Sequence, residues 1–292
     1  MSAAVKQPTY KRQRFLLSFV RQINRSVSAN DLQKLIFLYT MKNDSKYYEF
    51  VPYKFGSYSF QLEKDLDVLQ RNGFVNVDYV EGSKMIKAAG DYAKEDSFQI
   101  ARERGDALIR RTYREYPYYT INSEILSRLF QGDELKRFIS EREAYAKTKQ
   151  TLFTIGYEGK SIETFINTLI HNDVRLVCDV RKNPLSRKFG FSKRKLEHIT
   201  NAVGIKYLHI PDLGIESSQR SSLETSDDYK NLFADYEKTL PSRETSLDEV
   251  YALLQLHERI ALMCFELEPD MCHRHIIRDN IVSTHKVKSA DV

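Results

Sequence analysis

The sequence of 292 residues predicts an α/β domain with a mainly parallel sheet, preceded by a mainly helical domain. Two observations lead to this fold class. After residue 151, short runs rich in Val, Ile and Leu alternate with segments of helical period, which is a βαβ succession. Before residue 150, apolar residues recur mainly at helical spacing. The length also fits two domains of ordinary size better than one.

Composition narrows the class of protein. Hydrophobic residues make up 41% of the chain and charged residues 29%, which is typical of a folded, soluble protein. The sequence contains neither an apolar stretch of membrane-spanning length nor the apolar segment of a secretory signal. Its three cysteines do not suggest a disulfide framework. We therefore expect a cytoplasmic protein with reduced thiols and no membrane association.

The basic residues are concentrated near the N-terminus. The net charge of the chain is +5, and residues 1–50 contain nine basic and three acidic residues. This distribution favours a polyanionic partner for that region. A solvated basic face that binds nothing is the alternative.

Residues 1–97 form the first predicted domain. Ser28 is the expected N-cap of one helix, with Asp31 in a position resembling a capping box. A second helix carries an apolar stripe and stops at Gly73, after which Phe74 to Val80 alternates like the first strand of a hairpin. Helix, helix, hairpin is the order of a winged-helix-like domain, whose second helix commonly enters the major groove of double-stranded DNA. Such domains also serve for protein contacts alone, including homodimer formation.

Residues 98–150 are predicted to be a helical linker region. In its middle lies a tyrosine patch consisting of Tyr113, Tyr116, Tyr118 and Tyr119. These rings could stack on bases, or they could pack at a domain junction around Pro117. We favour packing and place the domain boundary near residue 150.

Residues 151–292 form the second predicted domain, an α/β domain of Rossmann-like type. Its expected strands are "TLFTIG", "VRLVCDV", "IKYLHI" and "RIALMCFE". In a parallel sheet, ligands bind beyond the carboxyl ends of the strands. The polar residues that follow these strands are therefore expected to share one edge of the sheet.

We expect an anionic ligand at that edge. Between Arg181 and Lys195 there are seven basic residues and no acidic one, and arginine forks suit phosphate. Near a helix N-terminus, Arg274 would act together with free backbone N–H groups. The expected substrate- or phosphate-binding residues are Tyr157, Arg181, Ser186, Arg187 and Arg274.

The same edge is expected to carry the catalytic groups. A carboxylate beside arginines stays ionised and can activate water, and a histidine can act as an acid or base. The candidate catalytic residues are Glu158, Asp179, Glu266, Cys272 and His273. An alternative for Asp179 is a structural pair with Arg181 or Arg187.

The cysteines allow two further interpretations. Cys272 could be a nucleophile activated by a helix N-terminus, or it could simply pack. A zinc site of Cys264, Cys272 and His273 is disfavoured, because Cys272 and His273 are adjacent and lack the Cys-x2-Cys spacing of structural zinc sites. We therefore expect no metal and no cofactor.

Four blocks together resemble the family known as domain of unknown function 488, over roughly residues 151–280. They read "TIGYEGKSIETFINTL", "VCDVRKNPLSRKFGFSKRKL", "GIKYLHIPDLGI" and "CFELEPDMCHRH". The resemblance implies a Rossmann-like fold and marks the DVR, PxSR and CHR blocks as the polar site. "DLQKLIFL" and "FVPYKFGSYSFQLEKDL" look like the winged-helix extension of longer members. One departure is "LGIESSQR", where many relatives have a second glycine after LG.

From these observations we expect a DNA-binding protein with a nucleic-acid-processing hydrolase domain that acts on nucleic acid or a nucleotide. Cleavage of an N-glycosidic bond, as in excision of a modified base, is favoured over phosphodiester cleavage. The latter normally needs a metal held by clustered carboxylates, and these carboxylates are spread over separate strands. The alternatives are a regulator that senses a nucleotide or other anion without catalysis, and a thiol enzyme centred on Cys272.

Overall fold

The computed structural model describes residues 7–90, 97–220 and 225–292. The chain divides into two compact units, Met1–Glu143 and Ala144–Val292. We call them the N-terminal unit and the C-terminal unit and describe each by itself.

The N-terminal unit contains helices and two small antiparallel sheets. The helices are α1 (Lys11–Ile23), α2 (Ala29–Asn43), α3 (Phe60–Arg71), α4 (Gly105–Glu115), α5 (Leu126–Leu129) and α6 (Gly132–Glu143), with the 3-10 turn η1 (Pro117–Thr120). The strands are β1 (Val27–Ser28), β2 (Val51–Tyr53), β3 (Gly56–Tyr58), β4 (Val75–Val80) and β5 (Ser83–Ala88). One sheet has the order β1-β5-β4, and β2 pairs with β3.

The elements predicted for this region are confirmed. The backbone N–H of Asp31 donates to Ser28 Oγ at 3.0 Å, so Ser28 caps α2. The apolar stripe of α3 is buried, and the helix ends two residues before Gly73, whose φ of +74° suits glycine. The chain then forms the expected hairpin of β4 and β5, joined by a turn at Glu81 and Gly82.

The tyrosine patch packs inside the N-terminal unit. Tyr113 is fully buried, and its hydroxyl lies 2.8 Å from Ser123 Oγ. The rings of Tyr116 and Tyr119 both make edge contacts with Phe37 of α2. Of the two interpretations of this patch, packing is therefore the one that the geometry supports. Base stacking by Tyr113 would require its ring to leave the core.

The C-terminal unit is an α/β structure with a five-stranded parallel sheet. The strands are β6 (Thr151–Gly156), β7 (Leu176–Asp179), β8 (Lys206–His209), β9 (Arg259–Cys264) and β10 (Ser289–Asp291), in the order β10-β6-β9-β7-β8. The helices are α7 (Ile162–His171), α8 (Lys193–Ala202), α9 (Ser226–Thr239), α10 (Glu244–His257) and α11 (Arg274–His285). The four predicted strands are confirmed. Sequence analysis missed β10.

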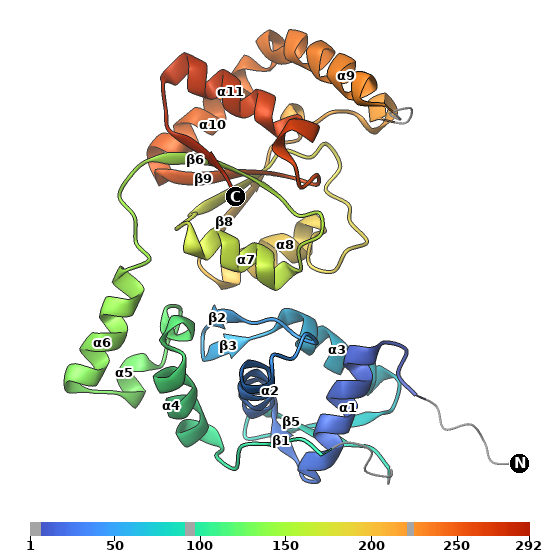
Figure 1. The fold of residues 1–292 in the computed structure, drawn as a ribbon, viewed down its shortest axis with the longest axis vertical. Helices are drawn as coiled ribbons and strands as arrows, with labels where there is room; N and C mark the ends of the chain where they lie inside the picture. The colour runs from blue at the N-terminus through green and yellow to red at the C-terminus, as the bar shows by residue number, and fades with distance from the viewer. Residues whose placement is uncertain (1–6, 91–96, 221–224) are drawn as a thin grey trace, which may run out of the picture. The chain divides into compact units, whose positions relative to one another are not determined.

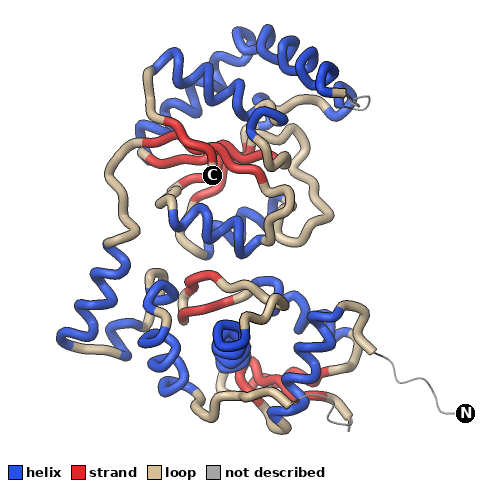
Figure 2. The backbone as a smooth tube through the Cα atoms, viewed as in Figure 1, coloured by secondary structure: helices blue, strands red, loops and turns tan. Residues whose placement is uncertain are grey.

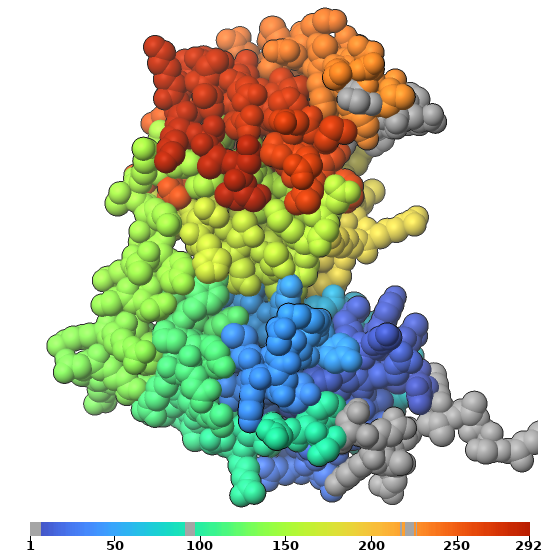
Figure 3. Space-filling model, in the orientation of Figure 1, coloured from blue at the N-terminus to red at the C-terminus, as the bar shows by residue number. Residues whose placement is uncertain are grey.

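The sheet lies between two layers of helices (Figures 1 and 2). Helices α7 and α8 cover one face. The other face packs its apolar side chains against α10 and α11 in one core, which also receives Tyr236 of α9. At the surface, α9 and α11 lie next to each other (Figure 3), and the rings of Phe233 and His275 are 5.4 Å apart. Helix coverage on both faces explains why β6, β7 and β9 are almost continuously apolar.

Two glycines allow close backbone approach at the carboxyl edge of the sheet. A Cβ on Gly156 would lie 1.8 Å from the carbonyl oxygen of Glu266. A Cβ on Gly214 would lie 2.2 Å from the backbone nitrogen of Lys182. Any side chain at either position would push these loops apart. The 3-10 turns between strands and helices on this edge are η2 (Pro211–Leu213), η3 (Ser217–Arg220) and η5 (Pro269–Met271), and η4 (Leu240–Arg243) joins α9 to α10.

The helices also bear on membrane association. Within the described ranges, none is both long enough and apolar enough to cross a bilayer. Residues 221–224, in the polar stretch of sequence that follows Leu213, lie outside the described residues.

The charged side chain of Lys34 is buried in the N-terminal unit. Lys34 of α2 is 1% exposed, and its Nζ donates to Asn30 Oδ1 at 2.7 Å and to the carbonyl oxygen of Ser57 at 3.2 Å. Burial lowers the pKa of Lys34 to about 7, although the nearby charge of Asp31 acts in the opposite direction. The folded unit therefore loses this proton at a much lower pH than the unfolded chain does.

This difference predicts a pH-dependent stability. Between pH 7 and about 10.4, the unfolded chain binds more protons at Lys34 than the folded chain, so the stability of the N-terminal unit should rise with pH. The slope for one group is at most ~1.4 kcal/mol per pH unit. Lys34→Met should be more stable than wild type at pH 7 and should show a smaller rise. Urea unfolding followed by circular dichroism at pH 7.5 and 9 measures both effects.

Lys42→Met, on the exposed side of the same helix, is the control and should keep the wild-type slope. Equal slopes for wild type and Lys34→Met would contradict the assignment.

Candidate functional site

The loops that follow four neighbouring strands meet at the carboxyl edge of the sheet. Strands β6, β9, β7 and β8 are adjacent and parallel, so their C-terminal ends lie on one side. A pocket of about 370 Å³ opens there. It is lined by Tyr157, Arg181, Lys182, Asn183, Leu185, Ser186, Arg187, Ile215, Cys264 and Phe265, which come from all four loops or strand ends. The pocket is therefore where the sequence analysis expected a ligand.

A buried ion pair lies under this pocket. Arg181 Nη2 and Nε donate to the two carboxylate oxygens of Asp179 at 2.5 and 2.8 Å, and both side chains are almost completely buried. The Arg181 backbone N–H and the Tyr207 hydroxyl also donate to this carboxylate, at 3.1 and 2.6 Å. Burial alone would lower the pKa of Arg181, but the hydrogen bonds and charge of Asp179 raise it above its ordinary value. The pair is charged and fully satisfied.

Arg181 also connects the loops around the pocket. Its Nη1 donates to the Tyr157 hydroxyl at 3.1 Å and to the Phe191 carbonyl at 3.0 Å. The Tyr157 ring stacks on Phe191 with centroids 4.3 Å apart. His209 Nε2 lies 2.8 Å from the Arg181 carbonyl oxygen. The structural alternative for Asp179 is therefore the one observed, and Asp179 has no exposed surface from which to activate water.

Arg274 does not have the exposed position that was expected of a phosphate-binding residue. It begins α11 as expected, but it is 1% exposed and does not line the pocket. Its guanidinium donates to the carbonyl oxygens of Glu266 and Leu267 at 2.6 and 2.9 Å and to Thr154 Oγ1 at 3.3 Å. The reason is local: the loop after β9 turns its carbonyls inward, and Arg274 satisfies them. Arg274 therefore stabilises the loop after β9 from the buried side of the carboxyl edge.

The exposed cation of the pocket is Arg187. Its side chain reaches solvent, whereas Lys182 is ion-paired with Glu216 at 2.9 Å. Ser186 also lines the pocket, and its Oγ accepts from the Lys188 backbone N–H at 3.2 Å. The basic loop thus presents Arg187 outward and keeps Arg181 inward.

The other two candidate carboxylates differ in accessibility. Glu158 is exposed, and its Oε2 accepts from the Leu267 backbone N–H at 3.1 Å. Lys188 is close enough that the charge of Glu158 opposes the lowering of the Lys188 pKa by burial. Glu266 is half-buried, with its Oε2 inside the protein. Neither residue is among those that line the pocket, but Glu158 directly follows the lining residue Tyr157.

Cys272 and His273 lie behind the pocket surface. Both are fully buried, and His273 Nε2 lies 3.1 Å from the carbonyl oxygen of Val180. Its Nδ1 is 3.9 Å from the sulfurs of Cys264 and Cys272. Hydrogen bonding to Cys272 and burial raise the pKa of Cys264 well above its ordinary value. In this arrangement His273 does not reach a substrate in the pocket directly, and a role as acid or base on the leaving group is not supported.

Sequence reasoning missed several lining residues. Lys182, Asn183 and Leu185 lie in the basic loop, and Ile215 and Phe265 follow β8 and β9. Tyr207, which shares the Asp179 carboxylate, lies within β8. The alternation of "IKYLHI" would have allowed Tyr207 to be assigned to the side of the strand that faces Asp179. Nothing in the sequence distinguishes Ile215 and Phe265 from core residues.

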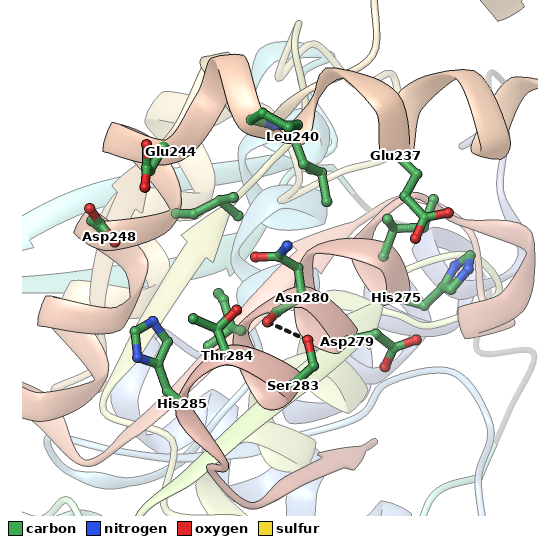
Figure 4. A pocket seen from close by; sticks show the side chains of 14 residues that line it. Glu237, Leu240, Glu244, Asp248, His275, Asp279, Asn280, Ser283, Thr284 and His285 are labelled. Carbon is green, nitrogen blue, oxygen red and sulfur yellow. Dashed lines mark hydrogen bonds between the residues drawn. The ribbon is translucent and has the colours of Figure 1, made fainter.

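A larger pocket of about 780 Å³ lies elsewhere in the C-terminal unit, between α11 and the α9–α10 region (Figure 4). Its titratable lining residues are Glu237, Glu244, Asp248, Asp279, His275 and His285. Four carboxylates without a lysine or arginine among the lining residues would repel an anion. The smaller pocket, which is lined by basic residues, is therefore the better candidate for an anion site than the larger one.

The geometry defines a class: an α/β domain with a basic pocket at the carboxyl ends of a parallel sheet. Residues 161–281, in the C-terminal unit, match the family described as "Domain of unknown function DUF488". The resemblance inferred from the sequence blocks is confirmed there, and the match does not extend to the N-terminal unit. No curated protein matches the chain, and no solved structure does.

The buried pair generates a testable prediction. Asp179→Asn leaves the Arg181 charge buried without its partner, which should cost ~3–5 kcal/mol of unfolding free energy. Tyr207→Phe removes a single hydrogen bond to the same carboxylate and should cost about 1 kcal/mol. Urea unfolding of both variants measures the difference.

A double variant, Asp179→Asn with Arg181→Met, removes both charges and should recover part of the loss. Equal losses for Asp179→Asn and Tyr207→Phe would show that the ion pair does not hold this edge together.

Proposed function

We propose that the protein is a nucleic-acid-processing hydrolase. In this proposal the N-terminal unit is a winged-helix-like domain that binds double-stranded DNA. The C-terminal unit is a Rossmann-like domain that hydrolyses an N-glycosidic bond of a phosphate-anchored nucleotide. The proposal depends mainly on one observation, the pocket at the carboxyl edge. This pocket is lined by Arg181, Lys182 and Arg187 and is supported by the Asp179–Arg181 pair.

The pocket supports binding of an anion. Arg187 is exposed and can contact a phosphate, while Lys182 can exchange its surface partner Glu216 for one. No lining residue among those described carries a carboxylate that would repel the ligand. The exposed rim residue Leu185 and the lining residue Phe265 offer apolar surface to an extruded base.

The order of elements supports the winged-helix interpretation of the N-terminal unit. Helices α1, α2 and α3 are followed by the β4–β5 hairpin, and β1 completes a three-stranded sheet with it. The hairpin exposes Tyr79 near its tip, with 72% of its surface accessible. An exposed aromatic ring on a hairpin is suited to contact a groove. The charge argument is weaker than the sequence suggested, because Arg12 pairs with Asp65 and Lys34 is buried.

Glu158 is the carboxylate best suited to activate water. It is exposed, it follows the pocket residue Tyr157, and its Oε2 accepts a hydrogen bond from the Leu267 N–H, which holds the side chain in place. In the proposed step, a water oxygen bonds to the anomeric carbon and gives its proton to Glu158. The carbon–nitrogen bond breaks, and its electron pair leaves with the base, which takes a proton from solvent. Asp179 acts as a positioning residue for Arg181.

The proposal predicts a specific loss of turnover. Glu158→Gln keeps the size and hydrogen-bonding capacity of the side chain but removes the base, so the turnover rate should fall ~10²–10⁴-fold while DNA affinity stays unchanged. Incubation of the full chain with duplexes carrying ordinary or modified bases, followed by mass spectrometry of released base, measures the rate. Nicks without released base would indicate phosphodiester cleavage instead.

The matched control is Glu237→Gln, which removes a carboxylate from the larger, acidic pocket. It should leave turnover unchanged. If Glu237→Gln abolishes turnover and Glu158→Gln does not, the larger pocket is the active site.

DNA binding by the N-terminal unit gives a separate prediction. Lys64 lies in the first half of α3, so Lys64→Ala should weaken binding and reduce the salt dependence by about one phosphate contact. Tyr79→Ala should weaken binding at all salt concentrations. Fluorescence anisotropy of a labelled duplex measures both. Lys136→Ala on α6, where the lysine pairs with Asp133, is the control; a loss equal to that of Lys64→Ala would contradict recognition by α3.

A second candidate function is a non-catalytic regulator in which a nucleotide or other anion at the pocket changes DNA affinity. One observation favours this regulator: the described lining residues include no carboxylate, and the buried carboxylate of Asp179 already accepts hydrogen bonds from four donors. Arg187→Gln separates the two functions. A regulator would lose the effect of nucleotide on DNA binding and would release no base with any duplex.

A further inference from the structure

Three side chains with metal-binding atoms converge behind the pocket. Cys264 ends β9, while Cys272 and His273 lie immediately before α11. Their ligand atoms all lie within 4.8 Å of one another, and all three residues are buried. We call them the Cys2His cluster. The spacing of these residues in the sequence does not indicate a metal site, because one ligand belongs to a strand and the other two to the turn that enters a helix.

The histidine is oriented as a metal ligand would be. His273 Nε2 lies 3.1 Å from the Val180 carbonyl oxygen, which can only accept, so Nε2 carries the proton. In a neutral imidazole Nδ1 then holds the free lone pair, and Nδ1 lies 3.9 Å from the sulfurs of both Cys264 and Cys272. Metal-ligating histidines typically donate their other ring N–H to a carbonyl in this way.

The distances fit a zinc-sized ion. Zinc–sulfur bonds of about 2.3 Å and zinc–nitrogen bonds of about 2.0–2.1 Å in a tetrahedral site place sulfur and nitrogen ~3.5 Å apart. The observed separations of 3.9 Å need adjustments of a few tenths of an ångström. The charges also fit: two thiolates neutralise a divalent ion, so no net charge enters the apolar core to which Cys264 and Cys272 belong.

We propose that Cys264, Cys272 and Nδ1 of His273 bind a zinc-like divalent ion through three protein ligands, with the fourth position directed toward the pocket. Cys264 supports this direction, because it belongs both to the cluster and to the pocket lining. Three protein ligands with one open position are typical of catalytic rather than structural zinc. One part of this proposal, that the ion would polarise a water or substrate atom, rests on the proposed hydrolase function. The binding itself does not.

The first test measures metal in the full-length protein, expressed with added Zn²⁺ and purified without chelator. Wild type should carry about one zinc per chain by elemental mass spectrometry. Cys264→Ser, Cys272→Ser and His273→Ala should each fall to background. Cys178→Ser is the matched control, because Cys178 is a buried cysteine of the same core but lies outside the cluster, and it should keep its metal.

A second test needs no variant to fold. Wild-type protein loaded with Co²⁺ in place of Zn²⁺ should show intense near-ultraviolet absorption from thiolate-to-cobalt charge transfer. Absence of this absorption, or retention of metal by a Cys264→Ser/Cys272→Ser double variant, would overturn the proposal. Equal metal loss in Cys178→Ser would also overturn it.

Metal content and turnover separate the two proposals. Stoichiometric zinc without release of base from any duplex would support the metal site and contradict the hydrolase. Release of base by protein that contains no zinc would contradict a catalytic role for the ion and support the hydrolase.

Discussion

The buried ion pair of Asp179 and Arg181 connects the loops after β6 and β7 with strand β8 beneath the pocket. One carboxylate at the end of β7 accepts from the guanidinium, from the backbone of the next turn and from Tyr207 on β8. The same guanidinium reaches Tyr157 after β6 and the carbonyl of Phe191 before α8. A charge that is removed from water needs partners in fixed positions, so this requirement constrains where the segments that contact the pair lie.

The arginines of the edge consequently divide into two groups. Arg181 and Arg274 are buried and satisfy protein oxygens, whereas Arg187 faces solvent. Only an exposed cation can exchange water for a ligand at low cost, so anion affinity depends on the outer part of the basic loop. The inner arginines contribute indirectly, because they hold that loop in a defined shape. In the proposed function, a site with one exposed arginine is suited to a single phosphate, and further affinity would come from the rest of a larger ligand.

The sequence predicted the periodic elements well and the directions of side chains poorly. Strands β6, β7, β8 and β9 follow from apolar runs bounded by polar residues, and the cap at Ser28 follows from local hydrogen bonding. Strand β10 has three residues and no apolar pattern, so only its pairing with β6 reveals it. It was also predictable that the polar residues following the strands lie at the carboxyl edge of the sheet. Whether Arg274 points to a ligand or to the carbonyls of Glu266 and Leu267 depends on how the loop folds back, which no local pattern encodes. The three residues of the Cys2His cluster were considered from the sequence and disfavoured as a zinc site because of their spacing, and only the turn between β9 and α11 brings Cys264 to Cys272.

The Cys2His cluster and the basic pocket are chemically compatible in a way that a cluster of carboxylates would not be. A substrate held by Arg187 brings negative charge to the edge, and carboxylates lining the same pocket would repel it. A divalent ion with two thiolate ligands is neutral as a whole, yet it still polarises whatever occupies its open position. This arrangement would supply an electrophile without adding negative charge at the point where the phosphate enters. In the proposed function the exposed carboxylate of Glu158 lies outside the lining, where it can accept a proton from water without contacting the anion.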